Sequence, residues 1–162
     1  RKLTLKIITL EEAYDELRMV QKTNYFLPIW LQILMSAVSS ACFLILFRGV
    51  WSDMPAAFLA GGAGYLALLA IQHVSKVKFF SEFFASFIVA LVAFFAVRFG
   101  FGYELDKIII SGVMPLVPGI LITNAVRDLM AGHLTAGIAK GTEAFLTAFA
   151  IGSGVAVVVV FH

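Results

Sequence analysis

The stretch Thr23–Phe47, TNYFLPIWLQILMSAVSSACFLILF, runs for 25 residues without a charged side chain and decides the fold class. A helix that crosses the hydrocarbon core of a bilayer needs about 20 mostly apolar residues. A single apolar segment in lipid can satisfy its backbone N–H and C=O groups only by forming a helix. We therefore predict a transmembrane helix over about residues 26–47.

Four more gaps between charged residues repeat this pattern along the chain. They are Met54–Ser75 with 22 residues, Phe83–Val97 with 15, Ile108–Val126 with 19 and Ala144–His162 with 19. The second of these gaps reaches spanning length only when Phe79 and Phe80 are added to it. The sequence thus predicts an all-α integral membrane protein with about five transmembrane helices, the last four over about 54–74, 79–99, 107–127 and 134–161.

The composition agrees with a lipid environment. Of the 162 residues, 61% are hydrophobic and 14% are charged, whereas a soluble domain carries about 25% charged residues. A chain of this length cannot bury such an apolar excess in its own core. The net charge of +2 is too small to indicate a nucleic-acid partner. The lone Cys42 excludes an intrachain disulfide.

Residues 1–24 have a different pattern. Leu3, Leu5 and Ile7 alternate with polar residues, as in a short strand. The following Thr9-Leu10-Glu11-Glu12 is a capping-box pattern, and an apolar stripe continues from Leu10 to Leu17. We predict a short amphipathic helix that ends a cytoplasmic domain at residues 1–24, before a transmembrane domain at 25–162. Because the chain opens without Met or a signal peptide, we expect it to be the C-terminal part of a longer protein, or its ordered remainder.

The distribution of Lys and Arg predicts the orientation in the membrane. With a cytoplasmic N-terminus, nine basic residues face the cytoplasm: Arg1, Lys2, Lys6, Arg18, Lys22, Lys76, Lys78, Arg127 and Lys140. Three face outward, namely Arg48, Arg98 and Lys107. The positive-inside rule therefore favours an N-terminus inside and, after five crossings, a C-terminus outside.

The segment at about 107–127 contains an interruption. Pro115 and Pro118 remove two backbone donors from mid-span, and Gly119 adds little rigidity to the helix. We expect Pro115 to push Met114 away from helical angles and to leave carbonyl groups near Ser111 and Met114 in need of partners. In transporters, such broken helices line a cavity where backbone groups meet substrate or ions. The alternative is a plain kink whose backbone groups are satisfied by neighbouring helices.

Polar residues follow this interruption. Asn124 and Asp128 are four residues apart and share a helix face, whereas Arg127 points to a different one. Glu143 lies among apolar residues of the last segment, where an ionisable group is a functional hypothesis by default. Two alternatives stay open. Arg127 and Asp128 could mark the membrane interface, and Glu143 could carry a coupling proton or pair with Lys140 or Arg127.

The sequence gives little support for metal binding or nucleophilic catalysis. The three histidines have no metal-ligand spacing, and no Ser, Cys or His arrangement suits a nucleophilic site. We therefore expect no enzyme activity, no cofactor and no metal. Small residues recur in the last segment at three- and four-residue spacing, which favours close helix packing: Gly137, Gly141, Ala144, Ala148 and Gly152.

A family resemblance lies in the part of the chain that carries these features. The residues concerned are Met114-Pro115-Leu116-Val117-Pro118-Gly119, Thr123-Asn124-Ala125-Val126-Arg127-Asp128-Leu129, Ala131-Gly132-His133, Gly137 and Glu143-Ala144. This pattern resembles the threonine/serine exporter family of bacterial inner-membrane proteins, and the resemblance extends over nearly the whole chain. Family members often carry an acidic residue where this chain has His133.

The resemblance implies a secondary exporter of small polar metabolites, which are threonine and serine in some members and dicarboxylates such as succinate in others. It also implies a partner, either a fused second membrane half or a smaller membrane subunit of the same family, and this chain would be the larger, N-terminal half. A homo-oligomer is a further possibility.

Our hypothesis is a proton-driven exporter in the bacterial inner membrane. The broken helix with Pro115, Pro118 and Gly119 would supply the substrate site, and Asn124 and Arg127 would bind a carboxylate. Asp128 or Glu143 would take part in coupling. The alternatives are a membrane scaffold that assembles a partner through residues 134–161, a channel subunit and, least favoured, a membrane enzyme that uses Asp128 and Glu143.

Overall fold

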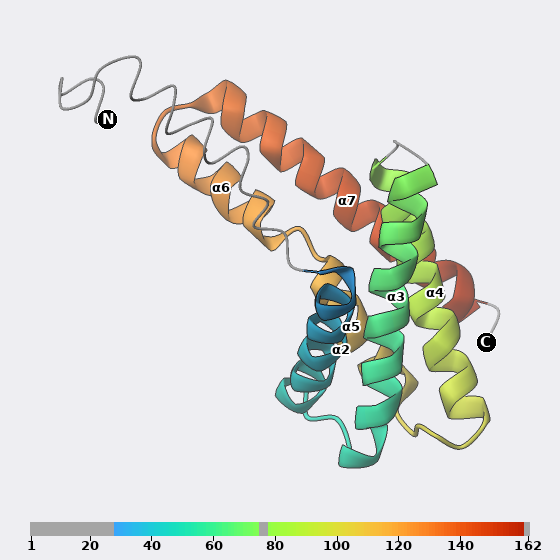
Figure 1. Ribbon diagram of the computed structural model, residues 1–162. Helices are drawn as coiled ribbons and strands as arrows, with labels where there is room; N and C mark the ends of the chain where they lie inside the picture. Colours follow the sequence, from blue (N-terminus) through green and yellow to red (C-terminus); the bar gives the residue numbers. More distant parts are fainter. Residues whose placement is uncertain (1–27, 75–77, 161–162) are drawn as a thin grey trace.

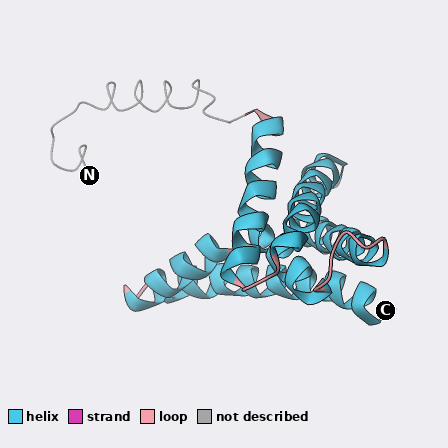
Figure 2. Cartoon of the chain, turned by 90° about the horizontal axis from the view of Figure 1, so that it is seen from below, coloured by secondary structure: helices cyan, strands magenta, loops and turns pink. Residues whose placement is uncertain are grey.

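The computed structural model describes residues 28–74 and 78–160. The strand and the amphipathic helix expected within residues 1–24 lie outside this range. In the described part, every regular element is a helix, as Figure 2 shows. In chain order the elements are α2 (Ile29–Leu46), η1 (Trp51–Asp53), α3 (Met54–Val74), α4 (Lys78–Arg98), α5 (Leu105–Val113), η2 (Met114–Leu116), α6 (Gly119–Met130) and α7 (Leu134–Val160).

The length and apolar composition of these helices suit a bilayer. Helices α2, α4 and α7, together with the stretch Trp51–Val74, are each long and apolar enough to cross a membrane. The pair Leu105–Leu116 and Gly119–Met130 passes the same test as one unit, although the two parts are bent by 59°. The chain is therefore an all-α integral membrane protein, and its described residues contain four candidate spans, or five if the bent pair counts as one. The break falls in the fourth of these five, as the proline pattern predicted.

Helices α2 to α5 form a bundle in which α3 packs against α2, α4 and α5 (Figure 1). Small side chains at the contacts let the backbones approach closely, which is typical of helix packing in lipid. A Cβ atom on Gly64 would overlap Val89, and one on Gly112 would lie 2.7 Å from Val89 Cγ1. Much of the buried interior is alanine: Ala56, Ala57, Ala60, Ala85, Ala90 and Ala93.

A buried carboxylate connects two loops at one end of this bundle. The side chain of Asp53 is fully buried and accepts hydrogen bonds from the backbone N–H groups of Tyr103 and Glu104, at 2.9 and 3.0 Å. Nearby, Lys107 donates to the carbonyl of Arg48 at 2.9 Å and to Glu104 Oε1 at 2.8 Å. These contacts hold the beginning of α5 against the loop between α2 and α3.

Helices α6 and α7 form a hairpin that projects from the bundle (Figure 1). The main packing partner of α6 is α7, and α7 continues from the hairpin into the bundle, where it packs on α4. A tight turn joins the two helices. Gly132 has a φ of +82°, Gly132 N–H donates to the Leu129 carbonyl and His133 N–H donates to that of Asp128. This is the Schellman pattern, which favours glycine at the left-handed position.

Candidate functional site

The break between α5 and α6 consists of one 3-10 turn followed by one extended residue. Val117, with φ −61° and ψ 130°, leaves the helical region directly before Pro118. Pro118 then forms an inverse γ-turn, in which Gly119 N–H donates to the Val117 carbonyl at 2.8 Å. The cap residue Pro118 makes no side-chain hydrogen bond to the beginning of α6. The positive end of this helix dipole lies at the centre of the bent span.

The conformation at Met114 corrects one expectation. Met114 keeps helical angles, with φ −51° and ψ −41°, and its carbonyl accepts a hydrogen bond from Val117 N–H at 3.2 Å. Pro115 fits at the start of the 3-10 turn, where its missing N–H costs little. The steric effect of proline on its predecessor therefore acts at Val117, not at Met114.

A cavity of about 320 Å³ lies between the break and α7. Its lining residues are apolar or glycine: Ile109, Ile110, Val113, Met114, Val117, Pro118, Ala148, Ile151, Gly152 and Val155. The half-buried Pro118 thus borders a hollow, whereas the position of Gly119 is open and a Cβ atom there would meet nothing within 4 Å. The break therefore borders a hollow on the side of α7.

An ion pair connects the two helices of the hairpin. Lys140 Nζ lies 2.6 Å from Asp128 Oδ2, with the side chains 41% and 22% exposed. The structure thus pairs Lys140 with Asp128 on α6, a partner that the sequence did not suggest. Close contacts flank the pair, because a Cβ on Gly137 would lie 2.7 Å from Leu129 Cγ. The ion pair and this close packing together fix the register of the hairpin.

The other predicted site residues on the hairpin differ in exposure. Asn124 and Glu143 are half-buried, and Arg127 is exposed. Asn124 lies one turn before Asp128, so the two side chains share the face of α6 that approaches Lys140. On α7, Glu143 follows Lys140 by three residues and shares its face. Asn124, Asp128, Lys140 and Glu143 therefore form one polar group within the hairpin.

The predicted site residues fall into two groups along the bent span. Pro115, Pro118 and Gly119 form the break itself, whereas Asn124, Arg127 and Asp128 lie farther along α6. At 1.5 Å per residue, Asp128 is about 14 Å from Gly119 along the helix axis. The structure therefore gives an apolar hollow at mid-span with a charged, hydrogen-bonding group more than one turn beyond it.

Sequence reasoning overlooked three polar residues that the structure makes prominent. Lys140 was considered only as a partner of Glu143, although the short turn at Gly132 places it beside Asp128. Asp53 was used only to mark the end of an apolar run, and nothing local shows that it is fully buried. Thr147, which is 1% exposed, gave no signal because a lone threonine is common in apolar helices.

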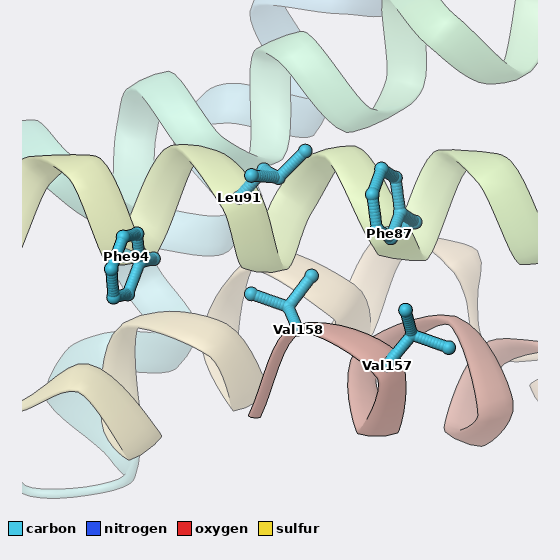
Figure 3. A pocket seen from close by; sticks show the side chains of 5 residues that line it. All are labelled: Phe87, Leu91, Phe94, Val157 and Val158. Carbon is cyan, nitrogen blue, oxygen red and sulfur yellow. The ribbon is translucent and has the colours of Figure 1, made fainter. Parts of the chain in front are cut away.

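A second cavity, of about 300 Å³, lies between α4 and the end of α7 and is shown in Figure 3. All its lining residues are apolar: Phe87, Leu91, Phe94, Val157 and Val158. Like the cavity at the break, this one offers no hydrogen-bonding side chain. We place the candidate site at the break and the hairpin because the interrupted backbone and the charged side chains lie there.

The fold and this site define the class of protein: a multi-pass α-helical membrane protein with one interrupted span and charged groups beside the interruption. Comparison with known proteins identifies the family. The family described as "Putative threonine/serine exporter" (ThrE) matches residues 1–162. The chain belongs to this threonine/serine exporter family, as its motif predicted.

Two relatives carry the same printed name, "Probable succinate transporter subunit YjjP". The protein from Klebsiella aerogenes is 26% identical over 151 residues, which cover 93% of this chain and 58% of the relative. The protein from Escherichia coli K12 is 32% identical over 139 residues, which cover 84% of this chain and 53% of the relative. The chain thus spans about half the length of the curated relatives it matches. No solved structure matches it significantly.

Proposed function

We propose that this chain is one half of a secondary transporter that exports a small carboxylated metabolite across the bacterial inner membrane. The observation that carries the proposal is the division of the bent span. Its first part, α5, is buried in the bundle and held by Asp53, whereas its second part, α6, packs chiefly on α7. Such an interrupted helix between a fixed and a peripheral element is typical of transporter sites.

The substrate class follows from the polar groups and the family. Asn124 and Arg127 offer hydrogen-bond donors to a carboxylate, which threonine, serine and succinate all carry. The beginning of α6, which has no side-chain cap from Pro118, adds a partial positive charge at the break. The family description names threonine and serine, and both relatives are named as succinate transporter subunits. We propose a carboxylated metabolite of this size as the substrate.

Coupling to protons is proposed for the ion pair and its neighbour. Protonation of Asp128 would remove the charge that holds Lys140, and the hairpin would then lose one of its connections. Glu143 shares the Lys140 face of α7 and is the second candidate for the proton. A second membrane half, such as a smaller subunit of the same family, would complete the pathway, in keeping with the word "subunit" in the relatives' names.

The test is uptake of radiolabelled threonine, serine and succinate into everted membrane vesicles, where export appears as accumulation. We expect saturable uptake that collapses with the proton gradient and falls at least ten-fold in Asn124→Ala and Arg127→Ala. Val126→Ala is the matched control, because Val126 lies between them on α6 with an exposed side chain. Wild-type vesicles that take up none of the three, with the partner half present, would overturn the proposal.

A further inference from the structure

Thr147 is a buried hydroxyl without a hydrogen-bond partner. Its side chain is 1% exposed in the middle of α7, and Oγ1 finds no donor or acceptor within residues 28–74 and 78–160. Leaving a buried hydroxyl unpaired destabilises a protein, and most such groups in folded proteins have a partner. The hydroxyl of Thr147 therefore calls for a functional explanation.

Other hydroxyl groups on α7 donate to backbone carbonyls of the preceding turn, whereas the hydroxyl of Thr147 does not. Thr142 donates to the Ile138 carbonyl at 2.9 Å, and Ser153 donates to the Phe149 carbonyl at 2.6 Å. This bond to the preceding turn is the ordinary arrangement for Ser and Thr in apolar helices. Thr142 and Ser153 lie on the same helix as Thr147, so helical geometry alone does not explain the unpaired hydroxyl.

The position of Thr147 connects the hairpin with the break. Lys140, Glu143 and Thr147 are spaced by three and four residues, so they follow one face of α7. Farther along this face, Gly154 packs on the backbone of α4. The side chains of α7 beyond Thr147 on this face are apolar. Thr147 is thus the deep end of a polar stripe formed by Lys140, Glu143 and Thr147.

The cavity at the break reaches α7 close to this residue. Ala148 and Ile151, which line the cavity, are the next residue and the residue one turn after Thr147. Thr147 is not among the lining residues of this cavity, so a ligand at the charged end of the stripe or in the hollow would reach its hydroxyl only when α7 moves away from the helices packed against it. The distance from Lys140 to Thr147 along the axis is about 10 Å, which is on the scale of a small metabolite.

We propose that the Thr147 hydroxyl binds the carboxylate of the transported metabolite, donating a hydrogen bond to one of its oxygen atoms. This inference rests on the proposed function and adds a binding residue to it. A threonine hydroxyl is a neutral donor, so it can bind a carboxylate at membrane depth without adding a buried charge. Serine, threonine and succinate share the group that it would recognise.

Transport kinetics in vesicles that contain the intact transporter test this inference. Thr147→Val keeps the shape and removes the hydroxyl, and we expect it to raise KM about ten-fold or more with a smaller change in kcat. Thr147→Ser keeps the hydroxyl and should stay within about three-fold of wild type. Thr142→Val is the matched control on the same helix, because that exposed hydroxyl bonds its own backbone, and its KM should not change. Succinate, serine and threonine are assayed separately to show whose carboxylate is bound.

Thermal unfolding of the same variants, measured without substrate, separates binding from structure. An unpaired hydroxyl destabilises the empty protein, so Thr147→Val should unfold at the same or a higher temperature than wild type. A wild-type KM in Thr147→Val would overturn this inference alone. Absence of transport by wild type would overturn the proposed function as well. If Thr147→Val does not assemble, Thr147→Ala provides the same comparison, and a wild-type KM in it would likewise overturn the inference.

Discussion

At the scale of single residues, the candidate site depends on a few polar groups in an apolar chain. Asp128 and Lys140 are paired across the hairpin, and Asn124 and Glu143 lie within one turn of this pair. Ionisable groups at membrane depth are costly and usually serve a function. The two carboxylates differ in position, because Asp128 on α6 pairs with Lys140 across the hairpin, whereas Glu143 lies on α7 three residues after Lys140.

The coupling role of the two carboxylates gives the first prediction. In Asp128→Asn, exchange of labelled for unlabelled substrate should persist, whereas accumulation driven by the proton gradient should fall at least ten-fold. The reason is that exchange needs only a binding site, and accumulation needs a group that gains and loses the coupling proton. Glu143→Gln undergoes the same two assays. If both variants accumulate substrate as wild type does, neither carboxylate carries the proton.

The buried Asp53 gives a second prediction at this scale. Asp53→Ala should destabilise the folded protein by about 2–4 kcal/mol, because two backbone N–H groups lose their charged acceptor in a buried place. Thermal unfolding in detergent measures the change. Asp106→Ala, at an exposed position near the same end, is the control and should change stability by less than about 0.5 kcal/mol. Equal stability of both variants would contradict the structural role of Asp53.

At the scale of elements, the contact between α7 and α4 depends on one glycine. A Cβ atom on Gly154 would overlap Ser86 and the backbone of Phe83, and it would lie 3.1 Å from Phe87 N. Two residues earlier, a Cβ on Gly152 would meet nothing within 4 Å. The sequence pattern assigned Gly152 to close helix packing and did not include Gly154, whereas the structure shows that Gly154 is the packing residue and Gly152 is open.

This contrast predicts opposite effects of one substitution. Gly154→Val should destabilise the protein by about 3 kcal/mol or more, because backbone atoms of α4 cannot move aside as a flexible side chain could. Gly152→Val should change stability by less than about 0.5 kcal/mol. Unfolding temperatures of the two variants, measured in the same detergent, test the difference. A Gly154→Val protein as stable as Gly152→Val would show that α7 packs differently on α4.

Much of this element structure was predictable from residues alone. The spacing of charged residues predicted an all-helical membrane protein, and Pro115, Pro118 and Gly119 predicted the interruption. The conformation within the break was not predictable in detail, because each proline removes a backbone donor and restricts its predecessor, so the helix could end at either one. Tertiary packing decided that Pro115 continues the helix as a 3-10 turn and that Val117 leaves it.

The sequence predicted most of the residues of the candidate site, but only part of how these residues are arranged in space. The family motif singled out Asn124, Arg127 and Asp128, but the pairing of Asp128 with Lys140 depends on how the Gly132 turn aligns two helices. Burial of Thr147 depends on contacts from distant parts of the chain, which no local pattern encodes. Roles in binding and coupling remain predictions that the experiments above address.

At the scale of the whole molecule, the arrangement of loops fits the predicted orientation. The loops that contain Arg48 and Glu104 meet at one end of the bundle through Asp53 and Lys107. Three basic residues belong to this end, whereas nine belong to the opposite side in the predicted topology. The positive-inside rule therefore predicts that the Asp53 end faces outward.

Cysteine labelling tests this topology. With Cys42 replaced by serine, a single cysteine at Ser52 should react with a membrane-impermeant maleimide on intact cells. A single cysteine at His133, in the exposed turn between α6 and α7, should react only after the membrane is opened. The reverse pattern would place the hairpin turn outside and contradict the predicted orientation.

The most direct test of the central claim, that this chain belongs to a carrier with a site at its broken helix, is counterflow in proteoliposomes. Vesicles that contain the transporter with its partner half are loaded with unlabelled succinate, serine or threonine and then diluted into a trace of the labelled compound. We expect a transient accumulation of label that saturates with substrate and disappears in Asn124→Ala and Arg127→Ala. Label that only equilibrates, at a rate proportional to concentration, would show a channel and contradict a carrier.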